Sequence, residues 1–172
     1  MLKTKAMLII AAVAILGTAA CGGKPPQAES TDLVAKGLQA QGAGNLDEAA
    51  RLYSAAIGKD PNNKFAYYDL GVVEQQRGRT SLAEGEYRQT LRVDPNFVPS
   101  LFNLAIIRTA AGSKTEAINL YRRAIAVKPD YAAAHLNLGF LLRDVGERTQ
   151  GDRELAKAIE IDPSLRSRVP GK

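Results

Sequence analysis

The sequence is poor in the residues that build disulfides, metal sites and most catalytic centres. Its 172 residues include one cysteine, one histidine and no tryptophan. A single cysteine excludes an intramolecular disulfide, and one histidine with one cysteine lacks the ligand spacing of a zinc site. His135 has no second histidine beside it, so we interpret it as a packed or half-exposed side chain rather than a base. The sequence therefore predicts no enzyme, no metal site and no cofactor.

The chain also lacks a strong charge imbalance and a long hydrophobic run. Its formal net charge is +5, but Lys3 and Lys5 lie in a segment that we expect to be removed, which leaves 21 basic against 18 acidic residues. This balance, with no basic run interleaved with aromatics, argues against nucleic acid as a partner. The apolar run 6–16 is also shorter than the roughly 20 residues that a membrane-spanning helix needs.

Residues 1–20 have the three parts of an export signal. MLKTK is short and positive, AMLIIAAVAIL is apolar throughout, and the small residues GTAA lead directly to Cys21. This order is typical of a secretory signal peptide. The small residues before Cys21 resemble the lipobox of bacterial lipoproteins, although Thr18 stands where that family usually has leucine. The resemblance implies cleavage before Cys21 and a diacylglycerol on its thiol.

Two alternatives to lipidation remain open. Ordinary signal peptidase could cleave after Ala20 and leave a soluble protein with a spare thiol, or the apolar segment could stay as an uncleaved anchor. We favour lipidation because an exported chain gains nothing structural from one free thiol, which is a chemical liability. The next residues, 21–29, are rich in glycine and proline and predict a flexible tether. We expect a lipid-anchored protein on the extracytoplasmic side of the bacterial cell envelope.

The rest of the chain follows a single period. Prolines recur every 34 residues at Pro61, Pro95, Pro129 and Pro163, and glycines recur with the same spacing at Gly44, Gly78, Gly112 and Gly146. Such a period is the signature of a repeat architecture. Glycine can close a helix end and proline cannot continue a helix interior, while apolar residues between them recur at helical spacing. The pattern predicts four helix hairpins at 30–63, 64–97, 98–131 and 132–165, with a C-terminal tail at 166–172.

The periodic residues of this chain resemble those of the tetratricopeptide repeat (TPR) family. The resemblance is carried by small residues at Gly37, Gly71, Ala105 and Gly139, by the alanine series 49, 83 and 117, by the tyrosine series 53, 87 and 121, and by the four prolines. It implies an all-α fold, a right-handed α-solenoid of four helix-turn-helix hairpins. The fourth unit departs with Gly151 and Leu155, which we expect to loosen the last hairpin. Polar residues of its second helix should cap the array.

The first helix of each unit has a second apolar face that the hairpin does not use. In this family the first helices line a concave groove, so the resemblance implies that this face binds a partner. The predicted partner-binding residues are Phe65, Tyr68, Asp69, Val72, Phe102, Asn103, Ile106, Leu136, Asn137 and Phe140. The amides could grip an extended peptide backbone, since each offers a donor and an acceptor. The alternative is that each asparagine bonds to a neighbouring helix and only fixes the stacking.

The sequence thus predicts a membrane-anchored protein–protein interaction scaffold or assembly factor of an envelope complex. Its partner would be a protein or peptide segment in the concave groove. The groove-facing positions hold no cluster of lysines and arginines, so a basic clamp for a C-terminal carboxylate is not expected. A second hypothesis is a structural module that self-associates as a homo-oligomer and has no separate client.

Overall fold

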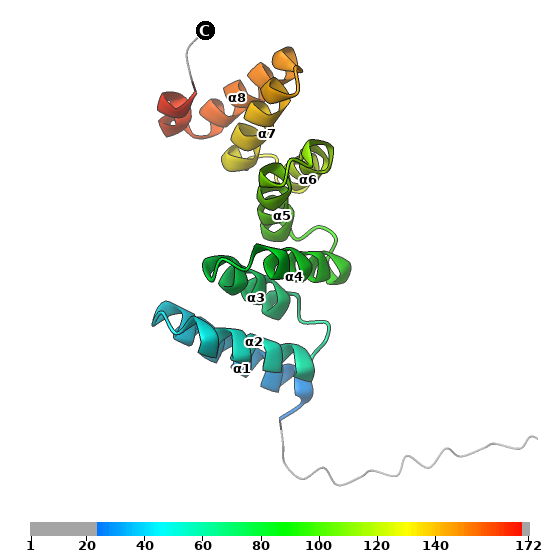
Figure 1. Ribbon diagram of the computed structural model, residues 1–172, viewed down its shortest axis with the longest axis vertical. Helices are drawn as coiled ribbons and strands as arrows, with labels where there is room; N and C mark the ends of the chain where they lie inside the picture. The colour runs from blue at the N-terminus through cyan, green and yellow to red at the C-terminus, as the bar shows by residue number, and fades with distance from the viewer. Residues whose placement is uncertain (1–23, 170–172) are drawn as a thin grey trace, which may run out of the picture.

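A computed structural model describes residues 24–169, which are helical over most of their length. The helices pair in chain order as hairpins (Figure 1). Their bounds are α1 Pro26–Gly42, α2 Leu46–Lys59, α3 Lys64–Gln76, α4 Thr80–Val93, α5 Val98–Ala110, α6 Lys114–Val127, α7 Ala132–Asp144 and α8 Arg148–Ile161, followed by a 3-10 helix, η1, at Pro163–Arg168. The predicted signal peptide and Cys21 lie outside the described residues. Helix α1 begins at Pro26, so the tether predicted over 21–29 is wrong for its last four residues.

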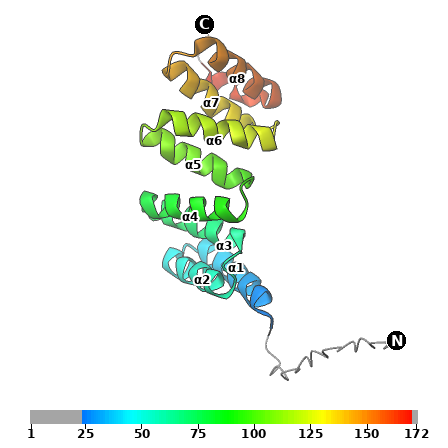
Figure 2. The ribbon, with the colours of Figure 1, turned by 90° about the vertical axis from the view of Figure 1, so that its right-hand side faces the viewer.

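The hairpins stack one above another, with the two ends of the described chain at opposite ends of the stack (Figure 2). Successive hairpins also turn relative to one another, so the stack is a superhelix and not a flat layer (Figure 1). A continuous core runs through units two to four, centred on Tyr87, Leu101, Leu104, Tyr121 and Leu138. The fold is the all-α solenoid of four hairpins that the sequence predicts.

The periodic glycines close the helices as the sequence predicts. Gly44, Gly78, Gly112 and Gly146 all have positive φ, between 74° and 89°. This is a left-handed conformation that glycine adopts without the steric cost paid by other residues. Each therefore turns the chain from the first helix of its hairpin into the second.

The small residues on the first helices let a tyrosine ring lie against the backbone. A Cβ added at Gly37 would lie 2.5 Å from Cε1 of Tyr53, and one added at Gly71 would lie 2.7 Å from Cε1 of Tyr87. Both tyrosines are fully buried. The glycine and tyrosine series of the sequence are thus two sides of one contact, repeated between the helices of a hairpin.

The last hairpin is closely packed, contrary to the loosening expected from Gly151 and Leu155. A Cβ at Gly151 would lie 2.7 Å from the carbonyl oxygen of Gly139, and a Cβ at Gly139 would lie 2.7 Å from Cγ of Leu155. The two glycines face each other, so the backbones of α7 and α8 approach closely. Leu155 fills the place of the missing tyrosine ring and is 2% exposed.

The C-terminal segment packs on the end of the stack. Leu165 and Val169 contact a buried cluster of Leu136, Leu155 and Ala158. Leu165 lies in η1, whose first turn is capped by the Asp162 side chain accepting from the Ser164 amide. Apolar side chains of this segment therefore cover the end hairpin, a role that the sequence analysis gave to the polar residues of α8.

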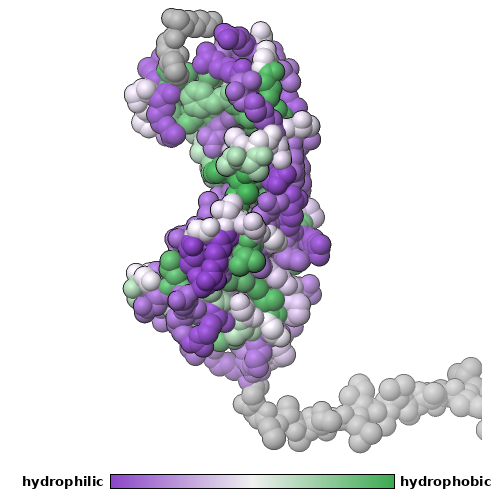
Figure 3. Space-filling view, viewed as in Figure 1, coloured by the Kyte–Doolittle hydropathy of each residue, from purple (hydrophilic) through white to green (hydrophobic). Residues whose placement is uncertain are grey.

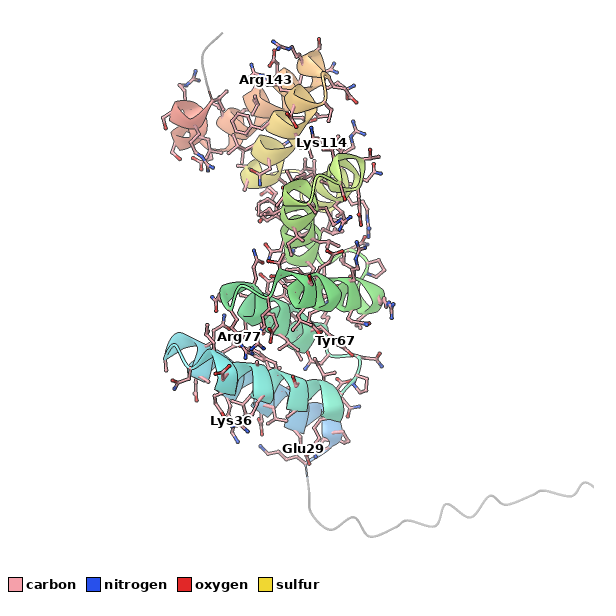
Figure 4. The ribbon with its side chains drawn as sticks, viewed as in Figure 1. Glu29, Lys36, Tyr67, Arg77, Lys114 and Arg143 are labelled. Carbon is pink, nitrogen blue, oxygen red and sulfur yellow. The ribbon has the colours of Figure 1, made fainter. Side chains whose placement is uncertain are left out.

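Ion pairs join neighbouring hairpins at their edges. Arg77, which follows the last residue of α3, pairs with Asp47 of α2, and Lys114 of α6 lies 2.7 Å from Asp144 of α7; Figure 4 labels Arg77 and Lys114. Arg108 of α5 bonds to Glu116 at 2.7 Å and reaches Glu84 of α4 at 3.3 Å. Such partly exposed pairs contribute about 0.2–1 kcal/mol each, so they help to set the stacking while the buried core dominates stability.

Candidate functional site: the concave groove

The predicted binding residues lie on three first helices, α3, α5 and α7. The molecule is hollowed on one side near the middle of the stack, with hydrophobic residues at the base of the hollow (Figure 3). Phe65 is 54% exposed, whereas Tyr68, Val72, Phe102, Ile106 and Phe140 are half-buried. These side chains are therefore neither core nor free surface, which is the state expected of a groove wall.

Part of the groove is a pocket of about 460 Å³ between α5 and α7. It is lined by Ile106, Thr109, Ala110, Tyr121, Asn137, Phe140, Leu141 and Asp144. Three of these, Ile106, Asn137 and Phe140, belong to the predicted set. The pocket is mainly apolar with a few polar groups, which is the usual make-up of a recognition site.

Each groove asparagine bonds to the tyrosine of the preceding hairpin. Asn103 Nδ2 lies 3.3 Å from Tyr87 Oη, and Asn137 Nδ2 lies 3.4 Å from Tyr121 Oη. Tyr87 in turn donates its hydroxyl proton to Gln75 Oε1 at 2.9 Å. The amide nitrogen thus helps to hold one hairpin on the next, as the alternative interpretation expects. Both asparagines remain half-buried at the groove, so this bond leaves the partner-binding prediction open.

Asp69 occupies the same position in the second unit but behaves differently. Within residues 24–169 its carboxylate makes no hydrogen bond or ion pair, and burial raises its pKa to about 6. Its charge helps to raise the pKa of Tyr53, Tyr68 and Tyr87, in each case after the larger effect of burial. Tyr53 gives its hydroxyl proton to Gln41 Oε1 at 2.9 Å. Tyr53 therefore has no hydroxyl proton left to donate to Asp69.

An aromatic wall lies beside Asp69, formed by Phe65, Tyr68, Tyr87 and Phe97. The Tyr68 ring lies 5.3 Å from Phe97 and 6.0 Å from Tyr87, and Phe65 meets Phe97 edge-on at 5.8 Å between centroids. The ammonium of Lys64 lies 5.4 Å from the Phe65 centroid and 5.6 Å from that of Phe97. This wall therefore already carries one cation on its ring faces, an arrangement that is favourable for aromatic side chains.

Leu136 is not on the groove surface. It is 1% exposed and packs with Leu155, Ala158, Leu165 and Val169. Leu136 repeats the position of Tyr68 and Phe102, but the C-terminal segment lies on it, and this segment has no counterpart in the earlier units. The prediction of Leu136 as a partner-binding residue conflicts with this burial. Phe140 packs against the same cluster but is only half-buried, so part of its side chain stays accessible.

Sequence reasoning missed several groove residues that lie outside the first helices or at their ends. Phe97 precedes α5 and Tyr131 precedes α7, and the Tyr131 ring lies 4.8 Å from that of Phe102. The two aromatic residues are 34 positions apart, so the period itself could have found them. Thr109, Ala110 and Asp144 lie near the helix ends that line the pocket.

His135, the single histidine, is held by neighbouring groups. His135 Nδ1 lies 2.6 Å from Glu154 Oε2, and Nε2 lies 3.0 Å from the Pro129 carbonyl oxygen. Both nitrogens are engaged in a buried link between α7, α8 and the preceding turn. Residues 24–169 contain no group of three or more metal-ligating side chains. No helix in the same range combines the length and hydrophobicity that a bilayer span requires.

Comparison with known proteins agrees with the geometry of the repeats. Family profiles described as "Tetratricopeptide repeat" and "TPR repeat" match residues 34–98 and 107–146. The chain carries tetratricopeptide repeats. No curated protein sequence matches the chain.

Solved TPR structures are similar in fold. The crystal structure of MamA is 27% identical, with a TM-score of 0.69 and 74% of each chain covered. PilF of Pseudomonas aeruginosa is 22% identical, with a TM-score of 0.70 over 81% of this chain and 64% of PilF. The first TPR domain of Spaghetti (RPAP3), bound to the HSP90 peptide SRMEEVD, is 18% identical, with a TM-score of 0.66 over 70% of this chain and 95% of that one. These similarities show that the chain shares its fold with solved TPR proteins.

Proposed function

We propose that this TPR protein binds a segment of a partner protein in the concave groove of α3, α5 and α7. The observation that carries the proposal is the pocket between α5 and α7, with three of the predicted residues in its lining. Phe65, at the other part of the groove, leaves more than half of its side chain exposed. Apolar side chains arranged along a hollow face are typical of protein-interaction sites. The RPAP3 domain, bound to a peptide, gives a precedent for this fold.

We further propose that the scaffold serves an envelope complex from a lipid anchor. This part rests on the sequence alone, on the positive start, the apolar run and the small residues before Cys21. Its test is incorporation of radiolabelled palmitate by growing cells that express the full chain or the variant Cys21→Ala. We expect palmitate label on the wild type and none on the variant. A wild-type protein that takes up no label would reject the lipid anchor.

The groove is tested by placing a photo-crosslinking amino acid at Phe65 and, as a matched control, at Leu82 in the full chain. Phe65 of α3 is 54% exposed and Leu82 of α4 is 53% exposed, so the two probes have equal access to solvent. Irradiation of living cells should give an adduct with a different protein from position 65 and none from position 82. An adduct between two copies of the chain would favour the self-associating module. Absence of any adduct from position 65 would reject the proposal.

A further inference from the structure

The part of the groove formed by α3 differs in charge from the parts formed by α5 and α7. The predicted binding residues and the pocket lining include two carboxylates, Asp69 and Asp144, and no lysine or arginine. Asp144 already pairs with Lys114 at 2.7 Å and is exposed. Asp69 is the carboxylate that the described residues leave without a cation. A charge withdrawn from water in this way is costly unless a partner group compensates it.

The surroundings of Asp69 specify what kind of group would compensate it. In the two later units the equivalent amide donates to the tyrosine hydroxyl of the preceding hairpin. Asp69 cannot donate when ionised, and the proton of Tyr53 is already given to Gln41. Both oxygens of this half-buried carboxylate therefore remain acceptors without a donor among residues 24–169, and the missing element is a hydrogen-bond donor. An ammonium or guanidinium group carries several donors and no acceptor.

The aromatic wall favours the same class of group. The Tyr68 ring contacts those of both Tyr87 and Phe97, and aromatic ring faces attract cations. Lys64 shows that the wall accepts a cation on the side of Phe65 and Phe97. The charge of Lys64 is itself balanced by Asp94 at 2.7 Å, so it does not neutralise Asp69.

We infer that Asp69, with the half-buried Tyr68 beside it, receives a lysine or arginine side chain of the bound segment. The inference rests on the proposed binding of a partner segment in the groove and names the chemistry of that segment. The partner would be extended, apolar along α5 and α7, and basic where it crosses α3. Charge-assisted hydrogen bonds to Asp69 would fix its register. An acidic segment such as the SRMEEVD peptide bound by RPAP3 would be disfavoured.

The test is selection of random twelve-residue peptides on the full chain held in detergent micelles, followed by binding assays. The wild type should recover peptides with a lysine or arginine at one fixed position among apolar residues. For a recovered peptide, Asp69→Asn should weaken binding about tenfold, the scale of one charge-assisted hydrogen bond. Replacing the basic residue of the peptide by norleucine should weaken binding to the wild type equally and leave binding to Asp69→Asn unchanged.

Two control variants separate this inference from the proposed function. Asp47→Asn should leave the affinity nearly unchanged, because Asp47 lies on α2, outside the groove, and has its own cation in Arg77. Ile106→Ala removes apolar groove surface and should weaken the binding of every recovered peptide. Two outcomes would overturn the inference while the proposed function stands. In the first, the recovered peptides lose affinity for Ile106→Ala but carry no basic residue; in the second, they lose affinity for Ile106→Ala but bind Asp69→Asn as tightly as they bind the wild type. Failure to recover any peptide that depends on Ile106 would overturn both.

Discussion

Gly71 and Tyr87 are in contact so close that a Cβ at position 71 requires the tyrosine ring to shift. The Cβ of an alanine there would lie 2.7 Å from Cε1 and 2.9 Å from Cδ1 of a tyrosine that is fully buried. We expect Gly71→Ala to destabilise the fold by about 1–3 kcal/mol, since the fully buried ring would have to shift within the packed core. Urea unfolding monitored by circular dichroism would show this as a lower midpoint.

Gly85 is the matched control for this substitution. It lies inside α4, is exposed, and a Cβ there meets nothing within 4 Å. Gly85→Ala should stabilise the protein by about 0.5–1 kcal/mol, because alanine loses less backbone entropy on forming a helix. An equal loss of stability in the two variants would show that position 71 is sensitive for a reason other than the tyrosine contact.

The elevated pKa of Asp69 predicts a pH-dependent effect on stability. Its pKa in the folded state, about 6, lies above the ordinary value, so folding favours the protonated form. Ionisation above that pH therefore costs stability, and below about pH 4 the cost is absent because both states are protonated. After allowance for its partial exposure, Asp69→Asn should be more stable than the wild type by about 1 kcal/mol at pH 8. The facing tyrosines remain neutral at this pH.

Urea unfolding at pH 8 and pH 4 checks this expectation. The advantage of Asp69→Asn should shrink as the pH falls through 6 and disappear by pH 4. Asp144→Asn is the control, because it removes an exposed carboxylate paired with Lys114 and should not gain stability at pH 8. A gain in Asp69→Asn that is the same at both pH values would indicate a new amide hydrogen bond rather than relief of a buried charge.

The asparagine–tyrosine contacts predict a small coupling between neighbouring hairpins. Asn103 Nδ2 lies 3.3 Å from Tyr87 Oη at a half-buried position. Removing one such bond should cost about 0.5–1.5 kcal/mol, so Asn103→Ala and Tyr87→Phe should each lower stability slightly, and the double variant should lose no more than the larger single effect. Peptide capture, in contrast, should weaken in Asn103→Ala more than in Tyr87→Phe. A loss of stability well beyond this range would assign the asparagine to packing alone.

The repeat itself could be predicted because each mark has a local physical cause. A positive φ requires glycine at Gly112, and a ring against a helix backbone requires a small residue at Gly71. The position of the second apolar face on the first helices could be predicted as well, because residues 34 positions apart occupy equivalent places in successive hairpins. What could not be predicted breaks the period. Leu136 lies where Phe102 lies one unit earlier, but only Leu136 is covered, because a segment outside the repeats folds back on it. The close approach of Gly139 and Gly151 likewise depends on two changes that occur together in the fourth unit.

The C-terminal segment should therefore stabilise the fourth hairpin and keep its end covered. Leu165 and Val169 pack on Leu136, Leu155 and Ala158, which are otherwise the open end of the stack. Replacing Leu165 and Val169 together by serine should cost about 1–3 kcal/mol in the last hairpin, the scale of two partly buried apolar side chains. Hydrogen exchange should become faster in α7 and α8 and stay unchanged in α1 and α2, since stability in a repeat array passes only between neighbours.

Ser164→Ala and Ser167→Ala together form the control, because both residues are exposed in η1 and their hydroxyls bond only to Asp162 and to the Ser164 carbonyl oxygen. Light scattering adds a second readout, since an uncovered Leu136 cluster would present an apolar end to a second copy. The serine double variant at 165 and 169 should self-associate at concentrations where the wild type and the control do not. If all three proteins show the same exchange in α8 and the same mass, the segment does not act as the cap, and the polar side chains of α8 must protect the end of the array.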